Sequence, residues 1–220
     1  NFKAYKALGN IYYSLGRLED SSKILNMARK KIPNDPILLN DLGVVEMKRN
    51  KYELSEKYFL QSIETNKNYK SAFNNLAALY QKIGKINKSI EIYKKLLLKF
   101  PNDPNILSNI GNALIDFNQY KDAIIYLKKS IKINPSESHF FSNLGRALFF
   151  SNNYKKAEEI LNKSVNLNPN NEEARLIFFY LFIVKNKLKD AWKYFESRIK
   201  VKNYFIPKNL GSIKNIKNSK

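Results

Sequence analysis

Residues 138–171 read SHFFSNLGRALFFSNNYKKAEEILNKSVNLNPNN, and this stretch shows how the whole chain is organised. Its pair Leu144-Gly145 has a counterpart at every earlier step of 34 residues. These counterparts are Leu8-Gly9, Leu42-Gly43, Leu76-Ala77 and Ile110-Gly111. A fixed period of this length indicates one supersecondary unit that is repeated along the chain.

Other residue types keep the same step. A bulky apolar residue precedes each pair by three places, at Tyr5, Leu39, Phe73, Leu107 and Phe141. Four places after the first member of each pair stand Tyr12, Glu46, Tyr80, Leu114 and Leu148. A small residue recurs later in the unit, at Ser21, Ser55, Ser89, Ala123, Ala157 and Ala191. A large apolar residue follows it, at Leu25, Phe59, Tyr93, Leu127, Leu161 and Phe195.

The residue types suggest how each unit packs. Proline closes the unit at Pro33, Pro101, Pro135 and Pro169, with Lys67 in that place once. Proline ends a helix because it lacks an N–H donor and restricts the residue before it. The Gly or Ala of the first helix allows close approach of the second, and we expect the small residue there to face it. The large residues are expected to fill the space between hairpins.

The phase of the pattern defines six units, 2–35, 36–69, 70–103, 104–137, 138–171 and a degenerate 172–205. Each is expected to hold helix A at positions ~3–15 and helix B at ~18–31, separated by a turn. The pattern resembles that of the tetratricopeptide repeat (TPR) family across residues 2–205. The resemblance implies an all-α, right-handed α-solenoid (superhelix) of about six 34-residue helix-turn-helix repeats. Helix A would line its concave wall and helix B its convex wall.

The sixth unit departs from the pattern. Residues 174–184 are apolar nearly all round, so they need cover on more than one side, and self-association would supply it. The run from Ala191 and Trp192 to Arg198 resembles the last repeat of bacterial proteins in which a TPR array precedes a glycosyltransferase-type domain. Residues 206–220 hold four Lys and no acid, which indicates a linker or tail, unless 200–206 folds back as a cap. The start at Asn1 suggests a fragment or a processed chain.

In a TPR array, helix A presents its functional side chains to the concave groove. The sixth position of three consecutive units is asparagine, at Asn75, Asn109 and Asn143. A carboxamide both donates and accepts hydrogen bonds, so one per repeat can clamp the backbone of an extended peptide. The series resembles the asparagine ladder of the O-linked N-acetylglucosamine transferase superhelix. Chance is the alternative, because 30 of the 220 residues are Asn.

Neighbouring groove positions complete the candidate peptide-binding set. They are Asp41, Asn40, Asn74, Asn112, Arg146, Lys6 and Asn10. Lys6 and Asn10 also match the start of the carboxylate clamp of chaperone-binding TPR proteins. That clamp is disfavoured because Asp41 would repel a carboxylate.

The net charge of +20 comes from 39 Lys plus Arg against 19 Asp plus Glu. Lys, Asn and Ile are abundant and Arg is scarce, which is typical of an A/T-rich genome rather than of selection for phosphate recognition. The basic residues map mainly to helix B and the loops, at Lys23, Arg29, Lys30, Lys31, Lys88, Lys94, Lys95, Lys99, Lys128, Lys129, Lys155 and Lys156. We interpret them as a solvated outer coat with weak attraction to acidic surfaces.

Catalysis and cofactor binding find no support in the sequence. There is no cysteine, and the single histidine, His139, is interpreted as a groove-rim or packing residue. The longest apolar run, Leu176–Val184, is too short to cross a bilayer, so a cytoplasmic location is expected. The sequence therefore predicts a non-catalytic protein-interaction scaffold without a cofactor. The alternatives are the substrate-recruiting part of a glycosyltransferase-like enzyme, or weak nucleic-acid binding through the Lys coat.

Overall fold

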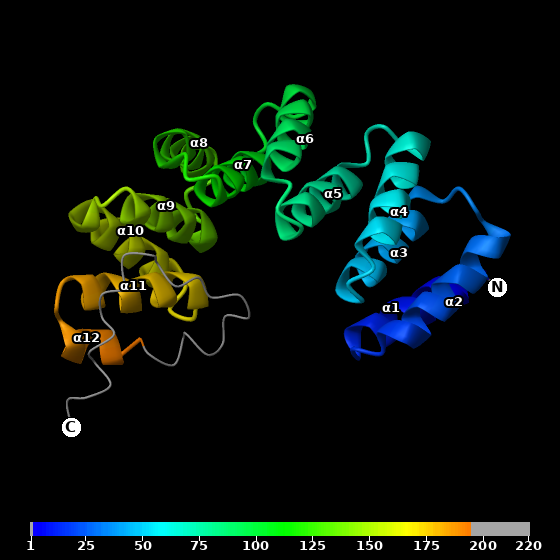
Figure 1. Cartoon of the computed structure of the whole chain (residues 1–220), viewed down its shortest axis with the longest axis horizontal. Coiled ribbons are helices and arrows are strands. Elements are labelled where there is room, and N and C mark those ends of the chain that lie inside the picture. Colours follow the sequence, from blue (N-terminus) through cyan, green and yellow to red (C-terminus); the bar gives the residue numbers. More distant parts are fainter. Residues whose placement is uncertain (1, 195–220) are drawn as a thin grey trace. The chain divides into compact units, whose positions relative to one another are not determined.

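The computed structural model describes residues 2–194, and these residues form helices connected by short turns, with no strand among them (Figure 1). The helices are α1 (Phe2–Ser14), α2 (Leu18–Lys31), α3 (Pro36–Lys48), α4 (Tyr52–Thr65), α5 (Lys70–Lys82), α6 (Ile86–Lys99), α7 (Pro104–Asp116), α8 (Tyr120–Ile133), α9 (Ser138–Phe150), α10 (Tyr154–Leu167), α11 (Glu172–Val184) and α12 (Leu188–Trp192). The predicted all-α, solenoid-type fold class is confirmed. Helix A of each unit is odd-numbered and helix B is even-numbered.

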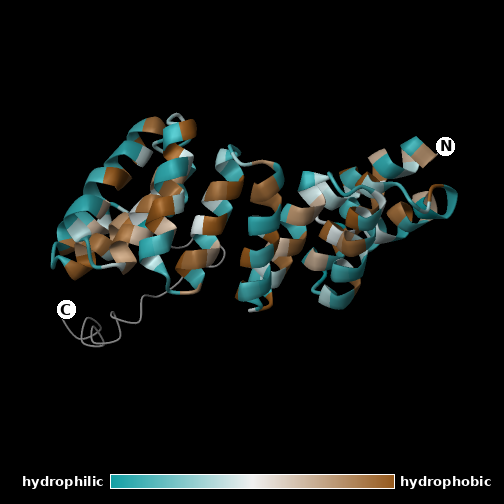
Figure 2. Cartoon of the chain, turned by 90° about the horizontal axis from the view of Figure 1, so that it is seen from above, coloured by the Kyte–Doolittle hydropathy of each residue, from teal (hydrophilic) through white to brown (hydrophobic). Residues whose placement is uncertain are grey.

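Two compact bodies make up the chain, divided between Pro101 and Asn102. The N-terminal body holds α1 to α6 and the C-terminal body holds α7 to α12. Most helices carry hydrophobic and hydrophilic residues on different sides (Figure 2). None of the helices between residues 2 and 194 combines the length and the apolarity needed to span a membrane.

Helix A begins earlier than the sequence pattern predicted. It occupies the first 13 residues of each unit rather than positions ~3–15, because the starting signals lie at the unit boundary. Asp35 accepts a hydrogen bond from the Leu38 backbone N–H at 2.7 Å, and Pro36 is the first helical residue. Asp103 likewise accepts a hydrogen bond from the Ile106 backbone N–H at 3.2 Å, and Pro104 is the first residue of α7. Proline is suited to this place since its missing N–H would have no partner there.

The turn between helix A and helix B uses the left-handed backbone conformation at one position of every unit. The residues with positive φ are Gly16, Asn50, Gly84, Asn118, Asn152 and Asn186, and they follow one another at 34-residue steps. Glycine and asparagine adopt this conformation most readily. Asn186 has a φ of 56°, so the sixth unit keeps this turn although its Leu-Gly pair is lost.

The glycines of helix A mark the closest approach within a hairpin. A Cβ added to Gly145 would lie 2.5 Å from the Leu161 side chain, and one on Gly43 would lie 2.5 Å from the Phe59 ring. The predicted small residue does face this point, because Ser55 Oγ donates to the Gly43 carbonyl at 2.7 Å. The large residues pack on these glycines as well as between hairpins.

A second set of buried serines ties the end of helix B to the start of helix A. Ser62 donates to the Pro36 carbonyl at 2.6 Å and Ser130 donates to the Pro104 carbonyl at 2.8 Å. Ser164 donates to the Ser138 carbonyl at 2.7 Å. Each bond satisfies a buried hydroxyl, which would otherwise destabilise the fold.

The sixth unit is described only in part. α11 is largely buried, and the rings of Phe178 and Phe182 stack with the ring of Tyr194 at centroid distances of 5.1 and 5.8 Å. The predicted glycosyltransferase-associated run extends to Arg198, and its residues from Phe195 onward lie outside the described residues, as do the end of the sixth unit and the tail 206–220.

The predicted outer coat is exposed. Every basic residue assigned to it is solvent-exposed, except Arg29, which is half-buried. Nucleic-acid binding through this coat stays a prediction.

Candidate functional site

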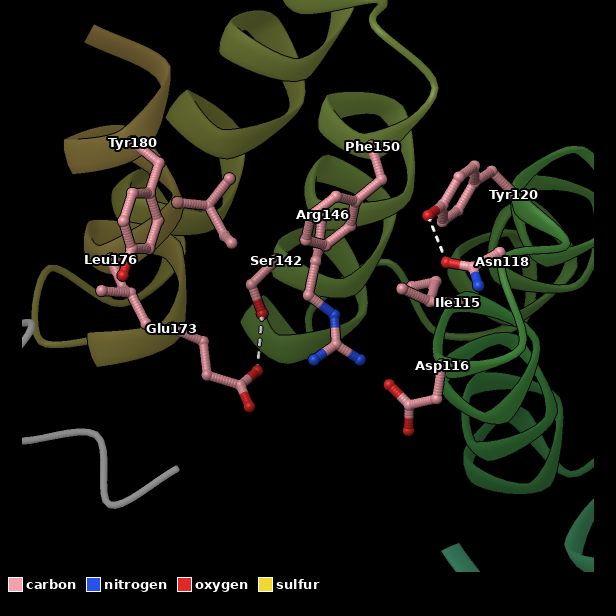
Figure 3. A pocket seen from close by; sticks show the side chains of 11 residues that line it. Ile115, Asp116, Asn118, Tyr120, Ser142, Arg146, Phe150, Glu173, Leu176 and Tyr180 are labelled. Atoms are coloured by element: carbon pink, nitrogen blue, oxygen red, sulfur yellow. Dashed lines mark hydrogen bonds between the residues drawn. The ribbon is translucent and has the colours of Figure 1, made fainter. Parts of the chain in front are cut away.

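A pocket of about 400 Å³ opens among α7, α9 and α11 of the C-terminal body (Figure 3). Its lining residues are Ile115, Asp116, Asn118, Tyr120, Ser142, Arg146, Phe150, Glu173, Leu176, Ile177 and Tyr180. The side chain of Arg146, from α9, extends between the carboxylates of Asp116, from α7, and Glu173, from α11. The pocket therefore combines a central cation, two acids and an apolar wall.

Arg146 has little of its hydrogen-bonding capacity used by the protein. Nη2 donates to Asn112 Oδ1 at 3.1 Å, and Nε is buried without a hydrogen-bond partner. No ion pair between Arg146 and a carboxylate occurs within the described residues. A guanidinium carries five N–H donors, so this side chain can still donate to a ligand.

The walls of the pocket are aromatic and aliphatic. The rings of Tyr120 and Phe150 stack with centroids 5.7 Å apart, and the Tyr120 hydroxyl donates to Asn118 Oδ1 at 2.6 Å. Leu176 and Ile177 on α11 contribute a buried aliphatic surface. Such a wall suits an apolar side chain of a ligand.

Two of the three predicted ladder asparagines link neighbouring repeats. Asn143 is 3% exposed, and its Nδ2 donates to Ser108 Oγ at 3.0 Å. Asn75 Nδ2 donates to Asn40 Oδ1 at 2.8 Å in the same relation between the sixth position of one unit and the fifth of the unit before. One donor of each amide is thus used within the protein. Asn109 is half-buried.

The inner residues of the first two repeats also pair with each other. Asn10 Nδ2 lies 3.4 Å from Asp41 Oδ2, and Lys6 Nζ lies 3.6 Å from Asp35 Oδ1. Burial raises the pKa of Asp41, although the bond from Asn10 and the charge of Lys6 oppose this. Asn74 is half-buried, and its Oδ1 is buried without a hydrogen-bond partner.

Of the predicted site residues, Arg146 lines the pocket, and Asn112 accepts a hydrogen bond from it. The prediction omitted Tyr120, Phe150, Glu173 and Tyr180 from the site. Phe150 and Asp116 both occupy position 13 of their units, which is a groove position, so the sequence alone could have indicated that Phe150 lines the site. Tyr120 lies on helix B, so a search restricted to helix A could not find it.

Family profiles described as tetratricopeptide repeat match residues 74–138 and 114–177. The chain belongs to the tetratricopeptide repeat family. The fold agrees, since the structure of PilF from Pseudomonas aeruginosa, itself 16% identical, superposes on this TPR chain with a TM-score of 0.72. That alignment covers 91% of each chain.

Two yeast proteins resemble the TPR chain over part of their length. The transcription factor tau 131 kDa subunit of Saccharomyces cerevisiae is 25% identical over 124 residues, which are 56% of this chain and 12% of that protein. The anaphase-promoting complex subunit CDC16 of the same organism is also 25% identical over 124 residues, 53% of this chain and 15% of that protein. The TPR chain therefore spans only a small part of the length of these relatives.

Proposed function

We propose that this chain is a protein-interaction scaffold that binds an extended segment of a partner protein against α7, α9 and α11. Its two yeast relatives are each described as a subunit, of a transcription factor and of the anaphase-promoting complex, which supports a role in protein assembly. The observation that carries the proposal is the pocket around Arg146, whose guanidinium makes a single hydrogen bond among residues 2–194.

The chemistry of the pocket suggests how a peptide would bind. Arg146 would donate a hydrogen bond to a backbone carbonyl of the peptide, because its guanidinium has only donors and the neutral carbonyl oxygen is an acceptor. Asp116 and Glu173 would accept hydrogen bonds from backbone N–H groups of the peptide or attract one of its basic side chains. Their negative charges disfavour a peptide carboxylate at this place. An apolar side chain of the peptide would lie against Phe150 and Leu176.

The asparagine ladder extends this proposal. Asn75, Asn109 and Asn143 would contribute carboxamide oxygens and remaining N–H groups along the inner helices. In this mechanism the links to Asn40 and Ser108 fix the orientation of two of the amides. A ladder residue that is itself anchored loses less entropy when a peptide binds.

The test is a peptide selection on the immobilised 220-residue chain. Random peptides displayed on phage are selected, synthesised with a fluorescent label, and titrated by fluorescence polarisation. We expect Arg146→Met and Phe150→Ala each to weaken binding about tenfold or more, because each removes a central contact. Replacing Asn75, Asn109 and Asn143 together by Ala should weaken it further if the ladder is used.

Arg17→Met is the matched control. Arg17 lies in the N-terminal body and pairs with Asp20 at the surface, so its loss should leave peptide affinity unchanged. Recovered peptides that bind Arg146→Met and Phe150→Ala as tightly as the wild type would contradict the pocket as the site. Unchanged affinity of the triple Ala variant would contradict the ladder alone.

A further inference from the structure

A second, separate hollow lies in the N-terminal body, among α4, α5 and α6, and its volume is about 480 Å³. Its apolar lining residues are Ile63, Phe73, Leu96 and Leu98. Ile63 belongs to α4, Phe73 to α5 and the two leucines to α6. We call this hollow the Leu98 groove. It contains none of the residues of the Arg146 pocket.

Leu98 breaks the repeat pattern. The corresponding residues of other units are Lys30, Glu64, Lys132 and Asn166, all of them polar. Leu98 is 85% exposed, so its side chain contributes nothing to the core. An exposed leucine where equivalent places are polar is not required by the fold, and this leucine lines the hollow together with other apolar side chains.

A second residue that departs from the repeat pattern lines the same groove as Leu98. Lys67 stands where four other units have the closing proline, and it lines the Leu98 groove. Phe73 also lines the groove. It is half-buried like Tyr5 of the first unit, whereas their counterparts Leu39, Leu107 and Phe141 are 2%, 4% and 8% exposed.

The rim of the groove is basic. Lys67, Lys95 and Lys99 line it together with a single acid, Glu64. Lys99 Nζ lies 5.4 Å from the centre of the Phe73 ring and donates to the Lys67 carbonyl. Lys95 is exposed. Three cations around apolar side chains, with one acid, select for a ligand that is both acidic and apolar.

We propose that the Leu98 groove binds an acidic segment of a partner protein, in which one bulky apolar side chain is flanked by Asp or Glu. The apolar side chain would cover Leu98 and Phe73, and the acids would meet Lys67 and Lys95. Charge disfavours two alternative occupants, the basic tail and a second copy of the chain. Residues 206–220 carry four Lys and no acid, and a second copy of a chain with a net charge of +20 would be repelled.

The probe is a fluorescent peptide of about twelve residues, with a central Leu-Phe pair flanked on each side by Asp and Glu. Two matched peptides separate the contributions. One replaces Leu-Phe by Ser-Ser, and the other replaces every acid by its amide. We expect the full 220-residue chain to bind the probe and to bind each matched peptide at least about tenfold more weakly.

Leu98→Asn tests the groove without disturbing the core and without adding a cation that would attract the acidic probe, because Asn166 is the residue at the corresponding place of another unit. It should weaken probe binding about tenfold. Lys67→Glu with Lys95→Glu should weaken it more strongly. The matched controls are Ile125→Asn and the pair Lys128→Glu with Lys129→Glu, on the exposed side of α8, and these should not change affinity.

Each other outcome overturns the proposal. Equal binding of the Ser-Ser peptide would reduce the site to general attraction by the Lys coat. Control variants that weaken probe binding as much as the groove variants would lead to the same conclusion. A dissociation constant above about 1 mM for the probe would contradict the proposal as well. A wild-type dimer in sedimentation that Leu98→Asn dissociates would make a second copy the occupant. Binding to anionic lipid vesicles that Leu98→Asn abolishes would assign the groove to a membrane surface.

Discussion

Arg49 and Arg146 lie near acidic side chains in the two bodies, and their hydrogen bonding differs. Arg49 Nη1 donates to both oxygens of the buried Glu46 and to Ser22 Oγ, and Nη2 donates to Glu19 at 2.5 Å. The bond to Glu19 raises the pKa of Arg49 and lowers the pKa of Glu19. Within the part of the chain that the structure describes, Arg146 instead makes one hydrogen bond, to the neutral amide of Asn112.

The difference separates a structural arginine from one that can bind a ligand. Glu46 occupies a place that holds Leu or Tyr in other units, so Arg49 compensates a charge inside the hairpin stack. Arg146 lines a pocket whose acids come from two other helices, and it does not pair with them. The number of charged partners that an arginine already has is therefore a better guide to function than its position in the groove.

The strongest test of this contrast is Arg49→Met. The substitution leaves Glu46 buried and unpaired, and we expect the free energy of unfolding to fall by about 3–5 kcal/mol. Urea denaturation followed by circular dichroism measures this. A loss below about 1 kcal/mol would show that Arg49 is as dispensable to the fold as Arg146.

The matched control to Arg49→Met is the double variant Glu46→Leu with Arg49→Met. Leu114 and Leu148 occupy the place of Glu46 in other units. Replacing a buried ion pair by apolar residues of similar size is often neutral or stabilising. The double variant should therefore recover most of the lost stability, and failure to recover would mean that Ser22 or packing dominates.

The opposite behaviour is expected of Arg146→Met. Stability should change by less than about 1 kcal/mol, because one hydrogen bond to a neutral partner is lost. Affinity for a selected peptide should fall about tenfold, equivalent to ~1.4 kcal/mol. Urea denaturation and fluorescence polarisation measure the two values. A large loss of stability with unchanged peptide affinity in Arg146→Met would mean that Arg146, like Arg49, is a structural residue.

A smaller effect distinguishes asparagines of the turns from those of the inner face. Asn152 has a φ of 60°, and its Oδ1 accepts a bond from the Tyr154 hydroxyl at 2.8 Å. Asn152→Ala should lower the free energy of unfolding by about 1 kcal/mol, whereas Asn152→Gly should cost less, since glycine adopts this conformation freely. Thermal denaturation of both variants is the measurement. Equal losses would mean that the Tyr154 bond, rather than the backbone, sets the preference for Asn.

The sequence could predict the hairpins because their contacts repeat within 34 residues. Gly145 and Leu161 keep a fixed spacing, and the packing of one on the other follows from their sizes. The fate of Asn143 could not be predicted, because its partner Ser108 is 35 residues away and differs from the Asn40 that serves Asn75. The Arg146 pocket combines side chains of α7, α8, α9 and α11, and a sequence pattern compared one position at a time does not show which of these side chains pair with one another.

The smallest expected effect concerns Asp41, the inner-face acid at the place where later units carry Asn75 and Asn143. Burial raises its pKa, so between the ordinary value of 3.8 and the raised value the folded chain binds more protons than the unfolded one. Stability due to this group therefore falls as the pH rises through that window, and the loss is complete above it.

Asp41→Asn removes that charge and restores the residue type of the later units. Asn10 can donate to the new amide oxygen as it does to the carboxylate, so little hydrogen bonding should be lost. We expect the variant to melt a few degrees higher than the wild type near pH 7 and at the same temperature near pH 3. Melting curves of both proteins across this pH range measure the difference in melting temperature. A difference that grows towards acid would mean that the charged form of Asp41 is favoured by Lys6 and Asn10, and that the N-terminal inner face, like Arg49, holds a compensated charge.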